Sequence, residues 1–302
     1  DALAAQNFTT TTDNYNVAIG FQAGAAVTTG VQNTLIGGLA GDAITGADHN
    51  VAIGYSALST ETLGQRSVAI GRSALQTQNS TTTTQVYNVG VGYNAGGSIT
   101  TGVENTIVGG LAGDAITSAE GNTTVGYLSL SAETQGKGSV AMGYHALRLQ
   151  NITSDSFALN TAIGYSAGEA VTSGVQNTIL GALAGDGLTD ADNNVAVGYL
   201  ALSGDSLGSF SVALGSSALA AQNFTTATSP YNTAVGALAG ASVTTGTSNT
   251  LVGGLAGDAL TTGDNNSVLG KSALSAATKS DRNVAVGKDA LTTLNHTTQT
   301  DA

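Results

Sequence analysis

One short pattern of apolar and polar residues recurs along the whole chain. It opens on Asn, continues with a β-branched, a small and an aliphatic residue, and ends on Gly, as in Asn16-Val-Ala-Ile-Gly20. Alternation with β-branched enrichment predicts a short strand of about 4–6 residues. The central glycine permits a backbone angle, or a close approach, that a side chain would block. Each copy therefore predicts one strand followed by one turn.

The spacing of the central glycines is regular. The position numbers of successive glycines differ by 17, 17, 17 and then 21, and this 72-residue cycle occurs four times. The central glycines are Gly20, Gly37, Gly54, Gly71, Gly92, Gly109, Gly126, Gly143, Gly164, Gly181, Gly198, Gly215, Gly236, Gly253, Gly270 and Gly287. Fixed periods of this kind are typical of solenoids. We predict an all-β fold, a parallel β-solenoid (β-roll) with one coil for each step of 17.

The 72-residue block is the unit of duplication. We expect a single repeat array over residues 1–302, with blocks at about 5–76, 77–148, 149–220 and 221–292 and the start of a further block at 293–302. The chain begins and ends inside a repeat, which indicates a segment of a longer array. Four extra residues per block predict insertions that bulge from the coil, at Gln76–Tyr87, Arg148–Leu159 and Ala220–Tyr231, and the N-terminal Ala4–Tyr15 matches them.

Two further columns have predicted roles. The Asn that opens the pattern, replaced by Ser67, Ser139 and Ser211 in the fourth coil of three blocks, predicts a hydrogen-bonded ladder along the stack. The alternative is an Asn that only tolerates a turn. Ala recurs three places after the central glycine and predicts a tightly packed position where two sheets or two chains meet.

Composition supports a repetitive fold and excludes others. The 42 Gly and single Pro exclude long helices, where each interior Gly costs roughly 1 kcal/mol, and Gly lacks the three-residue period of collagen. A net charge of -12 argues against binding nucleic acid or an anionic membrane. The absence of Cys excludes disulfides and thiolate sites. Apolar runs fall far below the ~18 residues of a membrane span, so we expect no membrane insertion by this segment.

The repeated pattern Asn-[Val/Thr]-Ala-[Ile/Val]-Gly-Tyr-x-Ala-[Leu/Gly], over about residues 14–292, resembles the head repeats of trimeric autotransporter adhesins. Similar repeats occur in phage tail fibres and other large secreted surface proteins. The resemblance implies a left-handed β-roll, three chains packed side by side, and a location outside the cell or at its surface. We expect a structural extracellular fibre or adhesin shaft, with the shaft of a phage receptor-binding tail fibre as the alternative.

Self-association is the expected partnership. A coil poor in bulky residues buries little apolar area alone, so we predict a homo-oligomer. This is either a trimer, as the resemblance implies, or a filament in which open coil ends pair head to tail. Tyr follows the central glycine in many coils, such as Tyr55 and Tyr93, and is expected to cap the core or lie in an interface.

No catalytic constellation is predicted. Gly164-Tyr-Ser166-Ala-Gly168 fits a nucleophile elbow. However, the repeat places Gln22, Asn94 and Leu238 where Ser166 stands. We therefore predict that the chain is not an enzyme. The three histidines, His49, His145 and His296, occupy unrelated repeat positions and are predicted to be exposed residues without a shared role.

An acidic pair recurs beside Gly-rich turns. Its members are Asp42 with Asp48, Asp114 with Glu120, Asp186 with Asp192, and Asp258 with Asp264. Hard carboxylate oxygens suit Ca²⁺, but each pair offers only two, and Asp is also a routine turn residue. We favour a solvated turn and predict no cofactor.

A glycosylation pattern recurs in the insertions and the tail. Asn-x-Thr occurs at the same place in each 72-residue block, at Asn7, Asn79, Asn151, Asn223 and Asn295. The middle residue varies while Asn and Thr are kept, as an N-glycan acceptor requires. The alternatives are O-glycans on the neighbouring Thr residues, or a loop whose Asn and Thr satisfy a turn. Another sequon, Asn122-Thr-Thr124, lies in a predicted strand and is expected to be bare.

Overall fold

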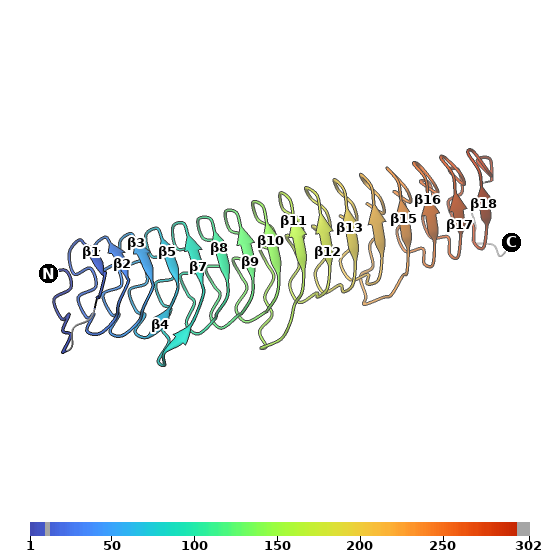
Figure 1. Cartoon of the computed structure of the whole chain (residues 1–302). Helices are drawn as coiled ribbons and strands as arrows, with labels where there is room; N and C mark the ends of the chain where they lie inside the picture. The colour runs from blue at the N-terminus through green and yellow to red at the C-terminus, as the bar shows by residue number, and fades with distance from the viewer. Residues whose placement is uncertain (10–12, 295–302) are drawn as a thin grey trace. The chain divides into compact units, whose positions relative to one another are not determined.

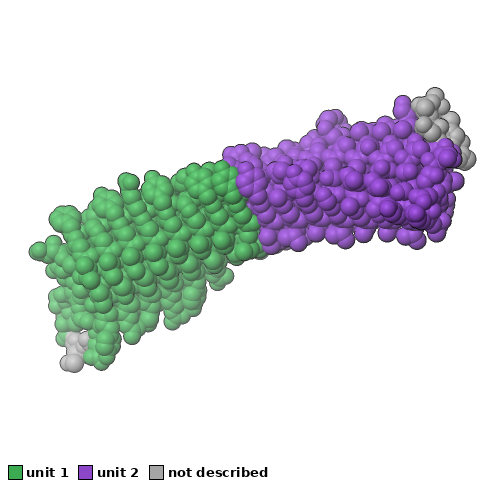
Figure 2. Space-filling model, turned by 90° about the horizontal axis from the view of Figure 1, so that it is seen from above, with its two compact units in different colours: residues 1–144, 151–157 green, residues 145–150, 158–302 purple. Residues whose placement is uncertain are grey.

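A computed structural model describes residues 1–9 and 13–294 of the chain. It confirms the predicted fold, an all-β parallel solenoid of about 16 turns, one for each copy of the glycine pattern (Figure 1). The chain forms two compact units, coloured separately in Figure 2. Unit 1 comprises Asp1–Tyr144 with Asn151–Phe157, and unit 2 comprises His145–Gln150 with Ala158–Ala302.

The main sheet of unit 1 is built from three-residue parallel strands. They are β1 (Val17–Ile19), β2 (Thr34–Ile36), β3 (Val51–Ile53), β5 (Val68–Ile70), β7 (Val89–Val91), β8 (Thr106–Val108), β9 (Thr123–Val125) and β10 (Val140–Met142). A separate small sheet pairs β4 (Gly64–Gln65) with β6 (Thr84–Gln85). The register joins each residue to its counterpart in the next coil, as Val17 to Thr34, and across an insertion, as Val68 to Val89.

Unit 2 repeats this arrangement. Its strands are β11 (Thr161–Ile163), β12 (Thr178–Leu180), β13 (Val195–Val197), β14 (Val212–Leu214), β15 (Thr233–Val235), β16 (Thr250–Val252), β17 (Ser267–Leu269) and β18 (Val284–Val286). All pair in parallel with their neighbours inside the unit.

The strands are shorter than predicted because the central glycine ends each one. Gly109 has a φ of +139°, and a Cβ built there would lie 2.4 Å from the carbonyl oxygen of Gly126 in the next coil. A side chain is thus excluded both by the backbone angle and by the close approach, as predicted. Backbone pairing between coils still continues past the strand, since Gly24 N–H donates to Ala40 O at 2.9 Å.

The interior of each coil is filled by small and aliphatic side chains. The Ala residues three places after the glycine, such as Ala23 and Ala40, are fully buried within a single chain. The expectation that this column marks a junction of two sheets or two chains is therefore wrong, because the column lines the inside of the coil. Gly41 leaves space for its neighbours, since a Cβ there would lie 2.7 Å from Leu35 Cδ2.

The predicted Asn ladder is present. Asn33 N–H donates to Asn16 Oδ1 at 2.8 Å, and Asn50 N–H donates to Asn33 Oδ1 at 3.0 Å. Each amide nitrogen also donates to a backbone carbonyl, as Asn33 Nδ2 does to Ala47 O at 2.8 Å. These bonds satisfy buried polar groups in the turn that precedes each strand, so the Asn is kept for the fold.

Candidate functional site

The outward face of the main sheet is uncharged, with Val, Thr or Ser at the first position of each strand and an aliphatic residue at the third. The middle residue of each strand points inward, while the residues on either side, such as Val17 and Ile19 in β1, point outward. Ile19 is 60% exposed and Met142 is 39% exposed, and none of the three-residue strands contains a charged residue. In each unit this sheet face offers a row of outward aliphatic side chains, one per coil, in a protein of net charge -12.

Aromatic residues border the sheet face. Tyr93 is 54% exposed, so the expectation that these rings cap the core does not hold within one chain. In unit 1, Tyr127 stacks on Tyr144 with ring centroids 5.7 Å apart, and the guanidinium of Arg72 lies 5.8 Å from the Tyr93 ring centroid. Aromatic rings therefore follow the sheet face at several coils of unit 1, with Gly38, Arg72 and Gly110 between them.

The insertions at Gln76–Tyr87, Arg148–Leu159 and Ala220–Tyr231 are each anchored by a buried carboxylate. Glu61 is fully buried, and its Oε1 accepts hydrogen bonds from the backbone N–H groups of Thr62, Leu63, Gly64 and Ser80 at 2.7–3.1 Å. The Ser80 bond joins the third coil of the block to the insertion that follows. Glu133 and Asp205 take the same place in the next two blocks, with N–H donors from Ile152 and Phe224.

A glutamine completes this anchor. Gln78 Nε2 donates to Glu61 Oε2 at 2.9 Å and to Ser67 Oγ at 3.0 Å. Gln78 Oε1 accepts from Asn88 Nδ2 at 2.9 Å. Ser67 replaces Asn in the ladder here because the Gln78 side chain occupies the space that an Asn would fill. We call Glu61, Ser67 and Gln78 the anchor set.

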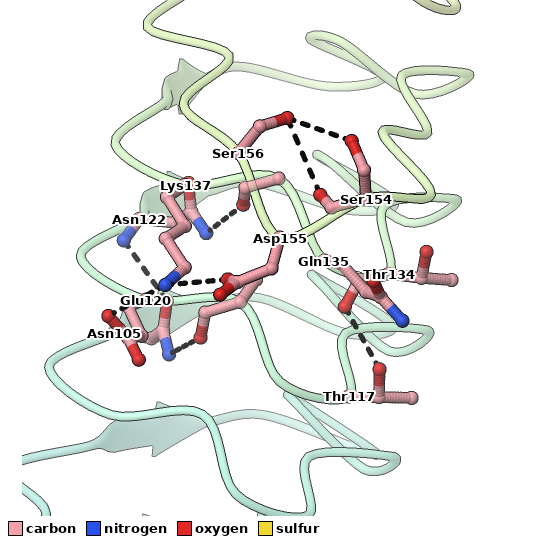
Figure 3. A network of polar contacts seen from close by, with 12 residues as sticks. Asn105, Thr117, Glu120, Asn122, Thr134, Gln135, Lys137, Ser154, Asp155 and Ser156 are labelled. Atoms are coloured by element: carbon pink, nitrogen blue, oxygen red, sulfur yellow. Dashed lines mark hydrogen bonds and ion pairs between the residues drawn. The ribbon is translucent and has the colours of Figure 1, made fainter.

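The insertion of the second block has an additional surface tie (Figure 3). Lys137 Nζ lies 2.6 Å from Asp155 Oδ1 in the insertion and 3.1 Å from Glu120 Oε2 in the preceding coil. Hydrogen bonds to Asp155 and then to Glu120 raise the pKa of Lys137. The other blocks place Gln65, Ser209 and Asp281 at the position of Lys137, so this tie is specific to one insertion.

The predicted glycan acceptors lie in the insertions as expected. Asn223 and Asn7 are exposed, and Asn79 and Asn151 are half-buried. Asn295 lies outside the described residues. The structure brings none of the acceptors together, because each belongs to a different block.

Sequence reasoning missed the ladder to which these Asn residues belong. Eight places after each central glycine stands Thr or Ser in the first three coils of a block and Asn in the fourth, as in Thr28, Thr45, Thr62 and Asn79. Thr45 Oγ1 donates to Thr62 O at 3.2 Å, and Thr62 Oγ1 donates to Asn79 Oδ1 at 2.9 Å. Aligning the coils at this column alone would have identified the ladder.

Ser166 is not placed as a nucleophile. It is 3% exposed, whereas an elbow serine must present its Oγ to a substrate. The neighbouring Glu169 has a pKa that burial raises, but hydrogen bonds from Ser166 and Arg148 outweigh this effect and lower it. His145 is not an exposed residue as predicted, since its side chain is 19% exposed and Nδ1 lies 3.3 Å from Glu169 Oε1.

The recurring acidic pairs behave as turn residues. Asp48 Oδ1 accepts from Val31 N–H at 2.9 Å, and Asp48 Oδ2 accepts from Gln65 Nε2 at 3.2 Å. Asp42 has a pKa raised by burial, which its own backbone hydrogen bond only partly offsets. Among residues 1–9 and 13–294, no three His, Asp or Glu side chains are grouped as metal ligands. The preference for a turn over Ca²⁺ stays a prediction.

The described residues form no helix with the length and hydropathy of a membrane crossing. The chain matches no protein-family model, no curated protein and no solved structure.

Proposed function

We propose that the chain is a structural shaft of an extracellular fibre or adhesin, assembled from copies of itself through the sheet face. The observation that carries this proposal is the uncharged row of outward aliphatic residues along each unit. Monomeric soluble proteins rarely expose a contiguous apolar patch larger than a few hundred Å². A row of eight strands at ~4.8 Å spacing extends roughly 34 Å within one unit, which is long for an uncovered apolar surface.

A second copy of the chain is the partner that fits this surface. The outward side chains are spaced one strand apart along the sheet face. A partner contacts all of them in the same way only if its own side chains have this spacing. Net charge of -12 makes copies repel elsewhere, whereas the sheet face has no charge to oppose contact. Three chains side by side is the arrangement that the resemblance to autotransporter head repeats implies.

A structural role agrees with the residues that recur from coil to coil. Within a coil the kept residues are central glycines, buried Ala and ladder Asn, all of which hold the backbone of one coil against the next. The variable residues lie in the insertions, which is where a displayed surface belongs. Non-enzymatic support of length and display is therefore the function that the geometry favours.

The oligomeric state tests this proposal. Analytical ultracentrifugation of the full chain at micromolar concentration should give a homo-oligomer. Replacing the outward residues Ile53 and Ile70 with Asp should shift it to monomer without loss of the β-sheet signal in circular dichroism. Ser98 and Thr101 are exposed turn residues off the strands, and the matched double Asp variant there should leave the oligomer intact. A monomeric wild-type chain would refute self-association through this face.

A further inference from the structure

The fold explains why Asn recurs in the Asn-x-Thr sites of the insertions. Asn79 Oδ1 accepts from Thr62 Oγ1 at 2.9 Å, Asn151 Oδ1 from Thr134 Oγ1 at 2.8 Å, and Asn223 Oδ1 from Ser206 Oγ at 3.3 Å. Each Asn thus forms the fourth rung of the hydroxyl ladder. Its recurrence alone says nothing about modification.

The fold does not explain the Thr two places after each Asn. Thr81, Thr153 and Thr225 are exposed, and in the part of the chain that the structure describes none of their hydroxyls makes a hydrogen bond. This position is nevertheless Thr in every copy, including Thr9 and Thr297. A residue kept through repeated duplication without a structural contact is kept for another reason.

The neighbouring hydroxyl residues provide a contrast. Three and five places after the Asn, the third insertion has Ser where the other copies have Thr, and in the described copies hydroxyls at these positions bond to each other or to the turn. Thr82 Oγ1 and Thr84 Oγ1 lie 3.1 Å apart, Ser154 Oγ and Ser156 Oγ lie 3.0 Å apart, and Thr228 Oγ1 donates to Thr226 O at 2.9 Å. Turn formation therefore accounts for those positions but not for Thr81, Thr153 and Thr225.

We propose that Asn79, Asn151 and Asn223 are acceptors for N-linked oligosaccharides, with Asn7 as the equivalent site of the first insertion. This is the modification for which Asn and a hydroxyl residue two places on are both needed. The inference does not depend on self-association through the sheet face.

The chemistry is compatible with the ladder. A glycosyltransferase would join the Asn Nδ2 to C1 of a sugar carried on a phosphate or diphosphate donor. The C1–O bond to the phosphate breaks, the phosphate leaves with the electron pair, and the amide loses one proton. The glycosylated amide keeps its oxygen as an acceptor, so the bond from Thr62 to Asn79 Oδ1 survives. A hollow lined by Asn79, Thr81, Thr84 and Thr101 gives the first sugar of Asn79 polar neighbours.

The chain contains its own negative control. Asn122-Thr-Thr124 has the same sequence pattern, but Asn122 is fully buried and its Nδ2 donates to Gly136 O at 2.9 Å. Thr124 is also buried and its Oγ1 donates to Ser129 O at 3.0 Å. Asn265-Asn-Ser267 occurs once and is not kept at the counterparts in other blocks, so it does not belong to the insertion set.

Glycopeptide mass spectrometry of protein purified from its native cells tests the inference. We expect sugar on Asn79, Asn151 and Asn223 and an unmodified Asn122. In the Thr81→Val variant, sugar should be lost at Asn79 only, while Thr81→Ser retains it. Because Thr81 makes no hydrogen bond, both variants should melt within about one degree of the wild type.

Three results would overturn the inference. The first is an unmodified amide at all three insertion sites in wild-type protein. The second is sugar confined to the hydroxyls of Thr81, Thr82 or neighbouring residues, which would show O-linked modification. The third is a Thr81→Val variant that keeps its sugar at Asn79 or that fails to fold, since either would give Thr81 a role other than acceptor recognition.

Discussion

The residues that join the third coil of a block to the fourth differ between the first block and the last; we call this junction the corner. In the first block it contains the anchor set Glu61, Ser67 and Gln78. In the last block the same places hold Ala277, Asn283 and Leu294. All three residues change together. Ser67 N–H and Asn283 N–H both donate to the Asn of the coil below, but only Asn283 adds a side-chain amide to the ladder, since its Nδ2 donates to Asn266 Oδ1 at 2.8 Å.

The difference shows that the anchor set is one cooperative unit. The buried carboxylate of Glu61 needs several hydrogen-bond donors. The Gln78 side chain fits because Ser67 is small, and an Asn in place of Ser67 requires that no glutamine fill the same space. A mixture of the two sets would leave buried groups unpaired or overcrowded. The residues that the repeats exchange together are therefore those that contact one another.

Removing the carboxylate alone should have the largest effect. Glu61→Ala leaves four backbone N–H groups without their acceptor and removes one of the two acceptors of Gln78 Nε2, and we expect a loss of about 3 kcal/mol in the free energy of unfolding. Urea denaturation followed by circular dichroism measures this loss. A loss below about 1 kcal/mol would mean that water replaces the carboxylate.

Removing the glutamine should have a smaller effect. Gln78→Leu deprives Glu61 Oε2, Ser67 Oγ and Asn88 Nδ2 of one partner each, and we expect a loss of about 2 kcal/mol. The same denaturation experiment applies. Gln76→Leu, a half-buried glutamine outside the anchor set, is the control and should be nearly neutral.

Exchanging the whole set should recover stability. The triple variant Glu61→Ala, Ser67→Asn, Gln78→Leu reproduces the corner of the last block. We expect its loss in the free energy of unfolding to be about 1–2 kcal/mol smaller than the summed losses of the three single variants, because substitutions of contacting residues are not additive. Additive losses would contradict the view of the anchor set as one unit.

A half-buried carboxylate with one unpaired oxygen should behave in the opposite way, with the smallest effect. Burial raises the pKa of Asp258 above its ordinary 3.8, backbone hydrogen bonds from Asp258 and Ala259 only partly offset this, and Oδ1 has no partner. Between the two pKa values the folded state binds more protons than the unfolded state. This group therefore lowers the free energy of unfolding as pH rises from 3.8 to the raised folded-state pKa. Asp258→Ser should raise the melting temperature slightly at pH 7, with no gain below the unfolded-state pKa.

Calorimetry at pH 7 and at pH 3 measures the two melting temperatures. Asp264→Ser is the matched control, because Asp264 Oδ1 accepts from Thr247 N–H at 2.6 Å and its loss should lower the melting temperature at pH 7. A lower melting temperature of Asp258→Ser at pH 7 would show that Asp258 has a favourable contact.

The sequence was sufficient to predict the strand and turn of each coil but not the anchor set that joins the third coil to the fourth. The period of the glycines determines the strand, the turn and the parallel pairing, because each coil meets the same neighbours in the next. Glu61 and Gln78 stand 17 places apart in the same column of adjacent coils, whereas Ser67 lies 11 places from Gln78 in another column, so no single column predicts the whole anchor set. Comparing the first and last blocks would have indicated it, since Glu61, Ser67 and Gln78 change together.

Of the candidate site, the sequence predicted the Asn residues of the insertions but not the contacts that they make with neighbouring coils. The Asn of each insertion was identified by its motif, whereas its ladder role depends on the rung below, which is Thr62 for Asn79. The sheet face was not predicted because strand residues were assigned to packing without regard to which side they face. The position of His145 beside Glu169 depends on a contact between adjacent coils that, within residues 1–9 and 13–294, occurs once.

The constant register has a consequence for how the chain reaches its fold. Strand partners inside each unit belong to consecutive coils, as Val17 with Thr34 and Val68 with Val89, so the loop that must close before any pairing is never longer than one coil. All-β proteins usually fold slowly because their strands pair over long separations, whereas this register keeps the contact order low. Within each unit, folding can begin at any coil and extend in either direction. A coil that opens breaks only its pairing with the two adjacent coils and leaves the pairing among the other coils intact, so each unit should unfold one coil at a time.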